Sequence, residues 1–286
     1  MKEIKFDKYQ GNGNDFIIVD LRELEIYKDF LLKEILDIKL LCNRNFGIGA
    51  DGVIFITKSN KNCDAKMIIY NSDNSEAEMC GNGIRCLIEY LNQNNNYKNE
   101  SCEYKIETKA GIKIGKYESG EISVKMGKPI LRNNLIPTTF DRKKNEILFK
   151  SLSFENFEAN GYAVGMGNPH LIFFVDNIKS ISHHVLGPVF ENDKSFPEKT
   201  NVHFCQIKDL ENIEVLVWER GAGATLACGT GACAVHVAAY KLGLCKSKTK
   251  IILPGGHLHI DWKDIDEEVI MIGKAKKVFT GIYKLN

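Results

Sequence analysis

Residues 80–94, CGNGIRCLIEYLNQN, and residues 228–242, CGTGACAVHVAAYKL, are two versions of one pattern. Each begins with Cys-Gly-x-Gly and continues into a helix-like segment, and the two cysteines stand about half of the 286-residue chain apart. A second pair of motifs recurs in the same order, GNGNDFIIVD at 11–20 and GMGNPHLIFFVD at 165–176. Two motifs repeated in order at nearly the same offset indicate a duplicated chain.

The residues after each cysteine predict a helix with one buried face. Apolar residues recur at the i, i+3, i+4, i+7 spacing: Ile84, Leu87, Ile88 and Leu91 in the first copy, and Val235, Ala238, Ala239 and Leu242 in the second. Short runs typical of strands flank both helices, such as GVIFIT at 52–57 and IEVLVWER at 213–220. We therefore expect an α+β fold of two similar halves with mostly antiparallel strands, and an active site in the cleft between them. Residues 31–42 predict a further amphipathic helix.

Composition narrows the class of partner. Lys and Arg total 38 and Asp and Glu total 37, so the formal net charge of +1 argues against a nucleic-acid-binding surface. No apolar run approaches the roughly 18 residues that span a bilayer, and the first residues lack the apolar core of a secretion signal. The nine cysteines include no CxxC pair, so we expect no metal site and reduced thiols in the cytoplasm.

A cysteine directly before a glycine turn and a helix is suited to proton transfer. The helix N-terminus offers backbone N–H groups and the positive end of the helix dipole, which favour thiolate and are expected to lower the thiol pKa. Two such thiols on opposite faces of one carbon atom suit inversion without a cofactor, because one removes a proton while the other delivers one. Two alternatives remain: the cysteines are small buried caps, or they form a disulfide between the halves.

Six stretches closely resemble the diaminopimelate epimerase family of cofactor-independent, two-cysteine enzymes. They are GNGNDFIIVD, CNRNFGIGADGVIF, YNSDNSEAEMCGNGIRC, GMGNPH, Asn201-Val202 and WERGAGATLACGTGACA, and they run from Gly11 to Ala234. The resemblance implies two pseudo-symmetric halves, each a central helix wrapped by a curved antiparallel sheet. The first half takes residues 1–127 and a returning C-terminal strand at about 275–286, and the second takes 128–274. A homodimer without a cofactor is also implied.

The resemblance further implies epimerisation of LL-diaminopimelate to the meso isomer. Cys80 and Cys228 match the two catalytic residues, and His170 and Glu219 match residues that tune the thiol pKa values. Glu219 and Arg220 match the pair that holds the distal amino-acid end, since a guanidinium suits a carboxylate and a carboxylate suits an ammonium group. The positions that match substrate contacts are Asn14, Asn71, Gly81, Asn82, Asn168, Asn201, Glu219, Arg220, Gly229 and Thr230.

Other interpretations stay open for these residues. Asn14 and Asn168 suit ordinary turns, His170 a loop histidine, and Glu219 with Arg220 a strand-end ion pair. The chain has Ala224 where most family members have glutamate, which bears on the substrate. Racemisation of another amino acid, histidine first and a lanthionine-type substrate second, uses the same chemistry. A noncatalytic amino-acid-binding protein or a thiol redox switch is the alternative from another class.

Overall fold

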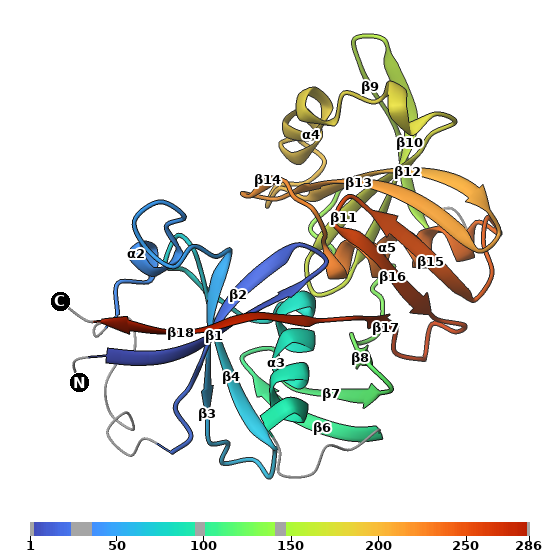
Figure 1. Ribbon diagram of the computed structural model, residues 1–286. Coiled ribbons are helices and arrows are strands. Elements are labelled where there is room, and N and C mark those ends of the chain that lie inside the picture. The colour runs from blue at the N-terminus through green and yellow to red at the C-terminus, as the bar shows by residue number, and fades with distance from the viewer. Residues whose placement is uncertain (1–2, 24–35, 95–100, 141–146, 285–286) are drawn as a thin grey trace. The chain divides into compact units, whose positions relative to one another are not determined.

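The chain forms two compact units, shown in Figure 1. The computed structural model describes residues 3–23, 36–94, 101–140 and 147–284. Unit 1 comprises Met1–Val124 with Gly273–Asn286, and unit 2 comprises Lys125–Ile272. The elements of unit 1 are β1 (Glu3–Gly11), β2 (Asn14–Asp20), α2 (Ile38–Cys42), β3 (Gly52–Thr57), β4 (Ala65–Asn71), β5 (Glu76–Ala77), α3 (Gly81–Asn94), β6 (Ser101–Thr108), β7 (Gly111–Glu118), β8 (Glu121–Lys125) and β18 (Lys276–Lys284). Those of unit 2 are β9 (Leu148–Phe154), β10 (Phe157–Gly165), β11 (Pro169–Phe174), η2 (Ile178–Ser180), α4 (His183–Glu191), β12 (Asn201–Asp209), β13 (Asn212–Glu219), β14 (Gly223–Ala224), α5 (Gly229–Lys241), β15 (Lys248–Leu253), β16 (Gly256–Asp261) and β17 (Ile270–Gly273).

The strands of the two units follow the same order and directions. In unit 1, β18, β1 and β2 pair antiparallel, β2 pairs parallel with β3, β3 pairs antiparallel with β4, and β4 pairs parallel with β6. In unit 2, β9, β10 and β11 repeat the antiparallel start, and the pairs β11–β12, β12–β13 and β13–β15 repeat the rest. The predicted duplication and the mostly antiparallel α+β fold are therefore confirmed.

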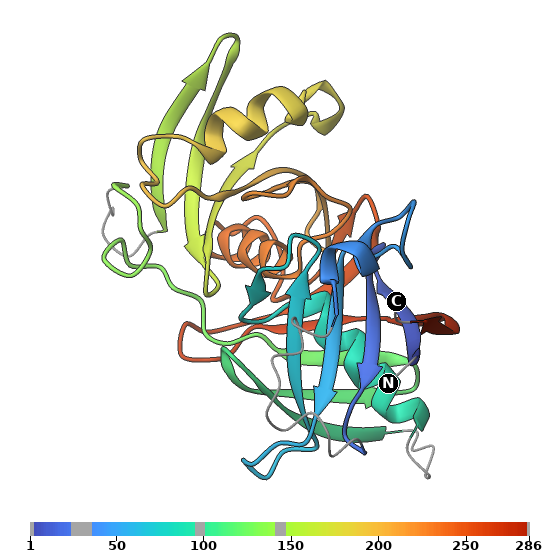
Figure 2. The same cartoon turned by 90° about the vertical axis from the view of Figure 1, so that its left-hand side faces the viewer.

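Each unit encloses one central helix. In α3 every residue from Gly81 to Asn92 is buried, and the helix contacts β1, β2, β7 and β18. In α5 nearly every residue up to Ala239 is buried, and the helix contacts β10, β11, β12, β15 and β16. Figure 2 shows both helices among the strands of their own units. A helix apolar on most sides is the kind that a wrapping sheet can cover.

Close approach of the strands to these helices is made possible by small residues. At Gly115 of β7, an added Cβ would lie 2.3 Å from Cδ1 of Ile88 on α3, so any other residue would push the strand away.

In unit 2, a second core joins the β9–β10 hairpin, α4, β11 and β12 through Leu152, Leu186, Phe173, Phe190 and Phe204. Figure 2 shows the yellow α4 beside the yellow-green hairpin.

The predicted helix over 31–42 is shorter where the structure describes it. Helix α2 begins at Ile38 because the side chain of Asp37 accepts a hydrogen bond from the backbone N–H of Leu40 at 3.0 Å, which caps the helix there. Leu36 and Asp37 precede the helix, and 31–35 lie outside the described residues.

The helix–strand contact yields a stability prediction. Ile88→Ala is expected to lower the free energy of unfolding by about 2–5 kcal/mol, because the fully buried side chain leaves a cavity between α3 and β7. The matched control is Ile112→Ala on β7, where the side chain is 48% exposed and the loss should stay below about 1 kcal/mol. Urea unfolding followed by circular dichroism measures both. Equal losses would contradict the enclosed position of α3.

Candidate active site

The predicted site residues of unit 1 gather at one edge of its sheet. Asn14 begins β2, Asn71 ends β4 and Cys80 directly precedes α3. Because β2 and β3 are parallel and β4 runs against β3, the start of β2 and the end of β4 lie at the same edge. Gly52 marks that edge, since it is in register with Phe16 on one side and with Asn71 on the other.

The sulfur of Cys80 caps helix α3. The backbone N–H of Gly83 points to Cys80 Sγ at 3.4 Å, and Sγ lies 3.7 Å from the side-chain oxygen of Asn14. The same Asn14 oxygen accepts a hydrogen bond from the amide of Asn82 at 3.3 Å. Unit 1 thus brings Asn14, Cys80 and Asn82 together, with Gly81 buried between the two last residues. A sulfur at this position meets N–H groups that stabilise negative charge.

A charged cluster holds Asn14 in place. The Asn14 side chain donates to Asp51 at 2.8 Å, and Arg44 bridges Asp51 and Asp15 at 2.8 Å each. Burial acts to raise the pKa of Asp15, but hydrogen bonds from Arg44 and Lys8 outweigh it and lower that pKa to about 2. Asp15 therefore stays ionised at neutral pH and keeps the cluster intact.

Two further features of unit 1 bear on the site. The exposed Asn71 donates to Ser75 at 3.0 Å. The fully buried Arg85 donates to the side-chain oxygen of Asn12 at 2.7 Å and to the carbonyl oxygen of Gly81 at 3.3 Å. Arg85 thereby ties the β1–β2 turn, which precedes Asn14, to the first turn of α3.

Unit 2 repeats the arrangement at the matching edge. Asn168 directly precedes β11, Asn201 begins β12 and Glu219 ends β13, while Cys228 precedes α5. Strands β11 and β12 are parallel and β13 runs against β12, as in unit 1. The sequence motifs therefore fall at equivalent points of the two units.

Cys228 caps α5 as Cys80 caps α3. Its sulfur accepts from the backbone N–H of Gly231 at 3.3 Å and lies 3.5 Å from the hydroxyl of Thr230. Gly229, between the thiol and these groups, is buried. Burial raises the pKa of the Cys228 thiol well above its ordinary value, and the negative charge of Glu219 adds to this. The hydrogen bonds from Thr230 and Gly231 act in the opposite direction.

The expectation of a lowered thiol pKa is therefore wrong for Cys228. The helix N-terminus does donate to the sulfur, but loss of water and a neighbouring carboxylate outweigh that effect. Cys228 is held as the neutral thiol, which is the form that can donate a proton.

Glu219 and Arg220 each bond to a group in another part of unit 2. Glu219 accepts from the hydroxyl of Thr225 at 2.6 Å, whereas the Arg220 guanidinium donates to the carbonyl oxygen of Glu198 at 2.9 Å. The buried side chain of Asn201 accepts from the backbone N–H of Arg220 at 3.0 Å and donates to the carbonyl oxygen of Pro169 at 2.9 Å. Asn201 thus links the ends of three strands.

A pocket of about 120 Å³ joins two of the predicted substrate contacts. Asn168 and Arg220 both line it, and the other lining residues are Ile130, Leu135, Ile136, Pro137, Gly165, Gly167, Pro169 and Glu198. The amide of Asn168 and the guanidinium of Arg220 suit a ligand that carries a carboxylate.

His170 lies in a buried chain of polar side chains. One ring nitrogen, Nε2, lies 2.8 Å from the side-chain oxygen of Asn168, and the other, Nδ1, lies 2.9 Å from Nε2 of His203. Burial lowers the pKa of His170 well below its usual range, and His203 and Arg220 add to the effect. Burial also lowers the pKa of His203 to about 3. His170 is therefore not a simple loop histidine, because both of its nitrogens are engaged.

Sequence patterns did not reveal several residues that support the site. His203 lies within an apolar strand run, so its alternation resembles that of a core residue. Arg85 lies within the buried stripe of α3, and no charge pattern distinguishes it. Asp51 and Arg44 belong to a stretch that matched the family motifs, and that stretch was the available signal for them.

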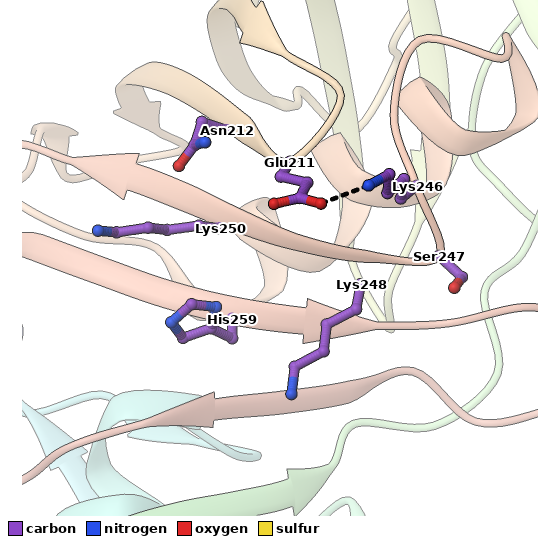
Figure 3. A pocket seen from close by; sticks show the side chains of 7 residues that line it. All are labelled: Glu211, Asn212, Lys246, Ser247, Lys248, Lys250 and His259. Carbon is purple, nitrogen blue, oxygen red and sulfur yellow. Dashed lines mark hydrogen bonds and ion pairs between the residues drawn. The ribbon is translucent and has the colours of Figure 1, made fainter.

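A larger pocket lies elsewhere on unit 2. Figure 3 shows this hollow of about 470 Å³, in which Lys246 pairs with Glu211 while Lys248 and Lys250 point in different directions. Its lining includes no cysteine and none of the predicted site residues. The pocket therefore takes no part in the chemistry described above.

The described residues contain neither a metal-ligand cluster nor a membrane-spanning helix. In residues 3–23, 36–94, 101–140 and 147–284, no group of three or more His, Cys, Asp or Glu side chains is arranged to hold a metal ion. In the same ranges, no helix has both the length and the apolar character required to cross a bilayer.

Solved structures share the fold over the whole chain. A hydroxyproline epimerase from Agrobacterium vitis matches with a TM-score of 0.71 at 10% identity, over 100% of this chain and 92% of that one. A PhzF-family phenazine biosynthesis protein from Bacillus anthracis matches with a TM-score of 0.69 at 14% identity, over all of both chains. The shared fold defines the class of this chain, a duplicated α+β fold of two similar halves.

Sequence comparisons identify the family within that class. The family model described as diaminopimelate epimerase matches residues 6–131 and 162–278. Proteins named diaminopimelate epimerase from Prochlorococcus marinus (strain NATL1A) and Microcystis aeruginosa (strain NIES-843) are 49% and 44% identical, covering 96% and 99% of this chain and 97% and 100% of theirs. The chain belongs to the diaminopimelate epimerase family.

The buried histidines predict a loss of stability in mild acid. Their folded-state pKa values are lowered, so below about pH 6.5 the unfolded chain binds protons that the folded chain does not, and the stability falls until the folded pKa, about 3 for His203, is reached. Between pH 7 and pH 5, where most carboxylates remain ionised, the free energy of unfolding should drop by about 2 kcal/mol for each histidine. Urea unfolding at the two pH values measures the drop.

One substitution controls this experiment. His203→Gln removes one titrating group and should reduce the drop. A wild-type protein with equal stability at both pH values would contradict the neutral state of the pair.

Proposed function

We propose that this enzyme, an isomerase, interconverts LL- and meso-diaminopimelate by inverting one α-carbon. The observation that carries the proposal is the repeated capping of a buried central helix by a cysteine sulfur, Cys80 in unit 1 and Cys228 in unit 2. Membership of the diaminopimelate epimerase family supports the choice of substrate.

Proton transfer is proposed to use both thiols. Cys80, as thiolate, takes the α-proton from one face of the carbon, and Cys228, as thiol, gives its proton to the opposite face. One C–H bond breaks and another forms, so Cys80 ends as thiol and Cys228 as thiolate, and the reverse reaction exchanges the roles. Burial and Glu219 favour the neutral form of Cys228 that this step requires.

The negative charge that develops on the substrate requires fixed donors. We propose that the first-turn backbone N–H groups at Gly81 and Asn82, and at Gly229 and Thr230, bind the carboxylate of the reacting centre. The first N–H groups of a helix have no partner within it, and the helix dipole favours negative charge at that end. Electron density from the broken C–H bond moves onto this carboxylate, so the donors act when charge accumulates. The reaction needs no cofactor in this scheme.

The distal end of the substrate is assigned to unit 2. Arg220 and Asn168 line one pocket and suit the distal carboxylate, while Glu219 suits the distal ammonium group. We propose that Asn14 and Asn71 in unit 1 and Asn201 in unit 2 complete the contacts, and that His170 keeps the surroundings of Cys228 uncharged. Ala224 is exposed and in register with Trp218, so the side chain at this position lies on the face of β13 that Trp218 occupies.

The thiols provide the direct test. Cys80→Ser and Cys228→Ser should each lower kcat by at least about 10²-fold, because a serine hydroxyl ionises too weakly to replace a thiol in general acid–base catalysis. Coupled assay of meso-diaminopimelate formation measures kcat, and circular dichroism checks folding. Cys63→Ser, which changes a partly exposed cysteine outside the site, should stay within about twofold of the wild type. Near-normal turnover in either site variant would refute the two-thiol scheme.

Solvent isotope uptake separates the alternatives for the wild-type enzyme. In D2O, early product should carry deuterium at the inverted carbon while recovered LL-diaminopimelate keeps its protium, because the proton delivered comes from the second thiol. Deuterium entering substrate as fast as product would indicate a single base. The same experiment with L-histidine should give no exchange; exchange with histidine alone would favour a histidine racemase, and exchange with neither would favour a binding protein.

We further propose that the chain acts as a homodimer in the cytoplasm. All nine cysteines are free thiols, which suits a reducing compartment. Strand β18 carries the exposed apolar residues Val278, Phe279 and Ile282, which are 56%, 45% and 63% exposed. Apolar groups gathered on one strand are typical of a protein interface.

Static light scattering tests the dimer. Phe279→Asp should shift the mass at micromolar concentration from dimer toward monomer, because a carboxylate in an apolar interface loses its hydration. Leu210→Asp, at an exposed apolar residue of unit 2, should leave the dimer intact. A wild-type protein that is monomeric at every concentration would contradict the proposal.

A further inference from the structure

His203 is a buried histidine that none of the predicted roles uses. It lies on β12, two residues after Asn201, and its side chain is fully buried. It touches two segments of the proposed active site in unit 2, the start of β11 through His170 and the first turn of α5 through Gly231.

The hydrogen bonds fix the protonation of both rings. The side-chain oxygen of Asn168 can only accept, so Nε2 of His170 carries a hydrogen and donates to it at 2.8 Å. A neutral His170 then has a bare Nδ1, which must accept from Nε2–H of His203 at 2.9 Å. The arrangement is a one-way chain of donors from His203 through His170 to Asn168, and it holds only while His170 is neutral, because a protonated His170 has no nitrogen left to accept.

The same ring supports the helix that carries Cys228. A Cβ added at Gly231 would lie 2.3 Å from Cε1 and 2.8 Å from Nε2 of His203, so the ring packs directly against the Gly231 backbone. The N–H of Gly231 is the group that donates to the Cys228 sulfur. The His203 ring therefore contacts both Gly231, whose N–H donates to the Cys228 sulfur, and His170, which donates to Asn168.

Space filling alone does not account for a histidine here. Nδ1 of His203 is buried with no hydrogen-bond partner among the described residues. An apolar side chain of similar size would fill the same space without burying an unsatisfied nitrogen. The feature that distinguishes histidine from such a side chain is the Nε2–H that reaches His170.

We propose that His203 is a positioning residue of the active site, which donates to His170 to fix its tautomer and supports Gly231 of α5, so that the Asn168 amide and the Cys228 thiol are held in place for substrate. The inference rests on the proposed function, because it takes Asn168 and Cys228 as groups that meet substrate.

Two substitutions at His203 separate the effect of its hydrogen-bond donor from the effect of its side-chain volume. Glutamine places an N–H near the position of Nε2, whereas methionine fills the space without a donor. His203→Gln should keep kcat/KM for LL-diaminopimelate within about threefold, and His203→Met should lower it at least tenfold. Equal kcat/KM values in the two variants would overturn the positioning role. If His203 only filled space, His203→Met would be as active as His203→Gln or more active.

A spectroscopic measurement needs neither substrate nor variant activity. In protein labelled with ¹⁵N-histidine, the wild-type His170 should show a protonated Nε2 and an unprotonated Nδ1 that accepts a hydrogen bond at pH 7. This Nδ1 resonance should be retained in His203→Gln and should shift toward that of an imidazole nitrogen without a donor in His203→Met. A wild-type His170 protonated on Nδ1 would overturn the inference, and this result stands even if the methionine variant fails to fold.

The experiment also distinguishes this inference from the function itself. If the wild-type enzyme does not epimerise diaminopimelate, the proposed function fails whatever the tautomer of His170. If the wild type turns over substrate and both His203 variants match it, the inference about His203 alone fails.

Discussion

The structure depends on a cysteine sulfur that caps a helix buried inside its own sheet. A helix N-terminus needs acceptors for its first N–H groups, and burial removes the water that would otherwise supply them. In both units the sulfur takes this role, toward Gly83 in unit 1 and Gly231 in unit 2. The requirement that completes the fold therefore also places a titratable group where backbone donors and the helix dipole converge. Under the proposed mechanism the helix caps and the acid–base groups are the same atoms, so the structural and chemical interpretations of these cysteines do not compete.

The two units share a backbone arrangement but differ in the charged groups around the thiol. Unit 1 surrounds its thiol edge with permanent charges, among them Arg44, Asp51 and the buried Arg85. Arg85 lies five residues after Cys80, and the equivalent position of unit 2, five residues after Cys228, is Cys233. Helix α5 therefore has no charge that matches Arg85. In unit 2, Asn168 bonds to a neutral histidine, His170, which bonds in turn to His203, while Arg220 and Glu198 line the pocket beside Asn168. Two copies of one fold thus give unlike surroundings to two chemically identical thiols, which suits the proposed mechanism, in which the two thiols are in opposite protonation states.

The sequence predicted the features that repeat or follow a period. The duplication, both central helices and the strand runs at 52–57 and 213–220 follow from pattern alone, and the fold agrees with them. The extent of α2 does not follow from pattern, because the helical pattern continues upstream of Asp37 whereas Asp37 caps the helix that begins at Ile38. The raised pKa of Cys228 and the contacts of His203 depend on burial and on strand register, and these arise only when distant segments pack together. Local pattern carries no information about such neighbours.

The pairing of β18 with β1 has a consequence for biosynthesis. Unit 1 is built from two stretches of chain, and residues 276–284 form one of its strands, whereas unit 2 is continuous from Lys125 to Ile272. On the ribosome, unit 2 can complete its core while the first 124 residues still lack their last strand. The half that is translated first therefore finishes folding second, and until then β1 has an open edge that other strands can pair with.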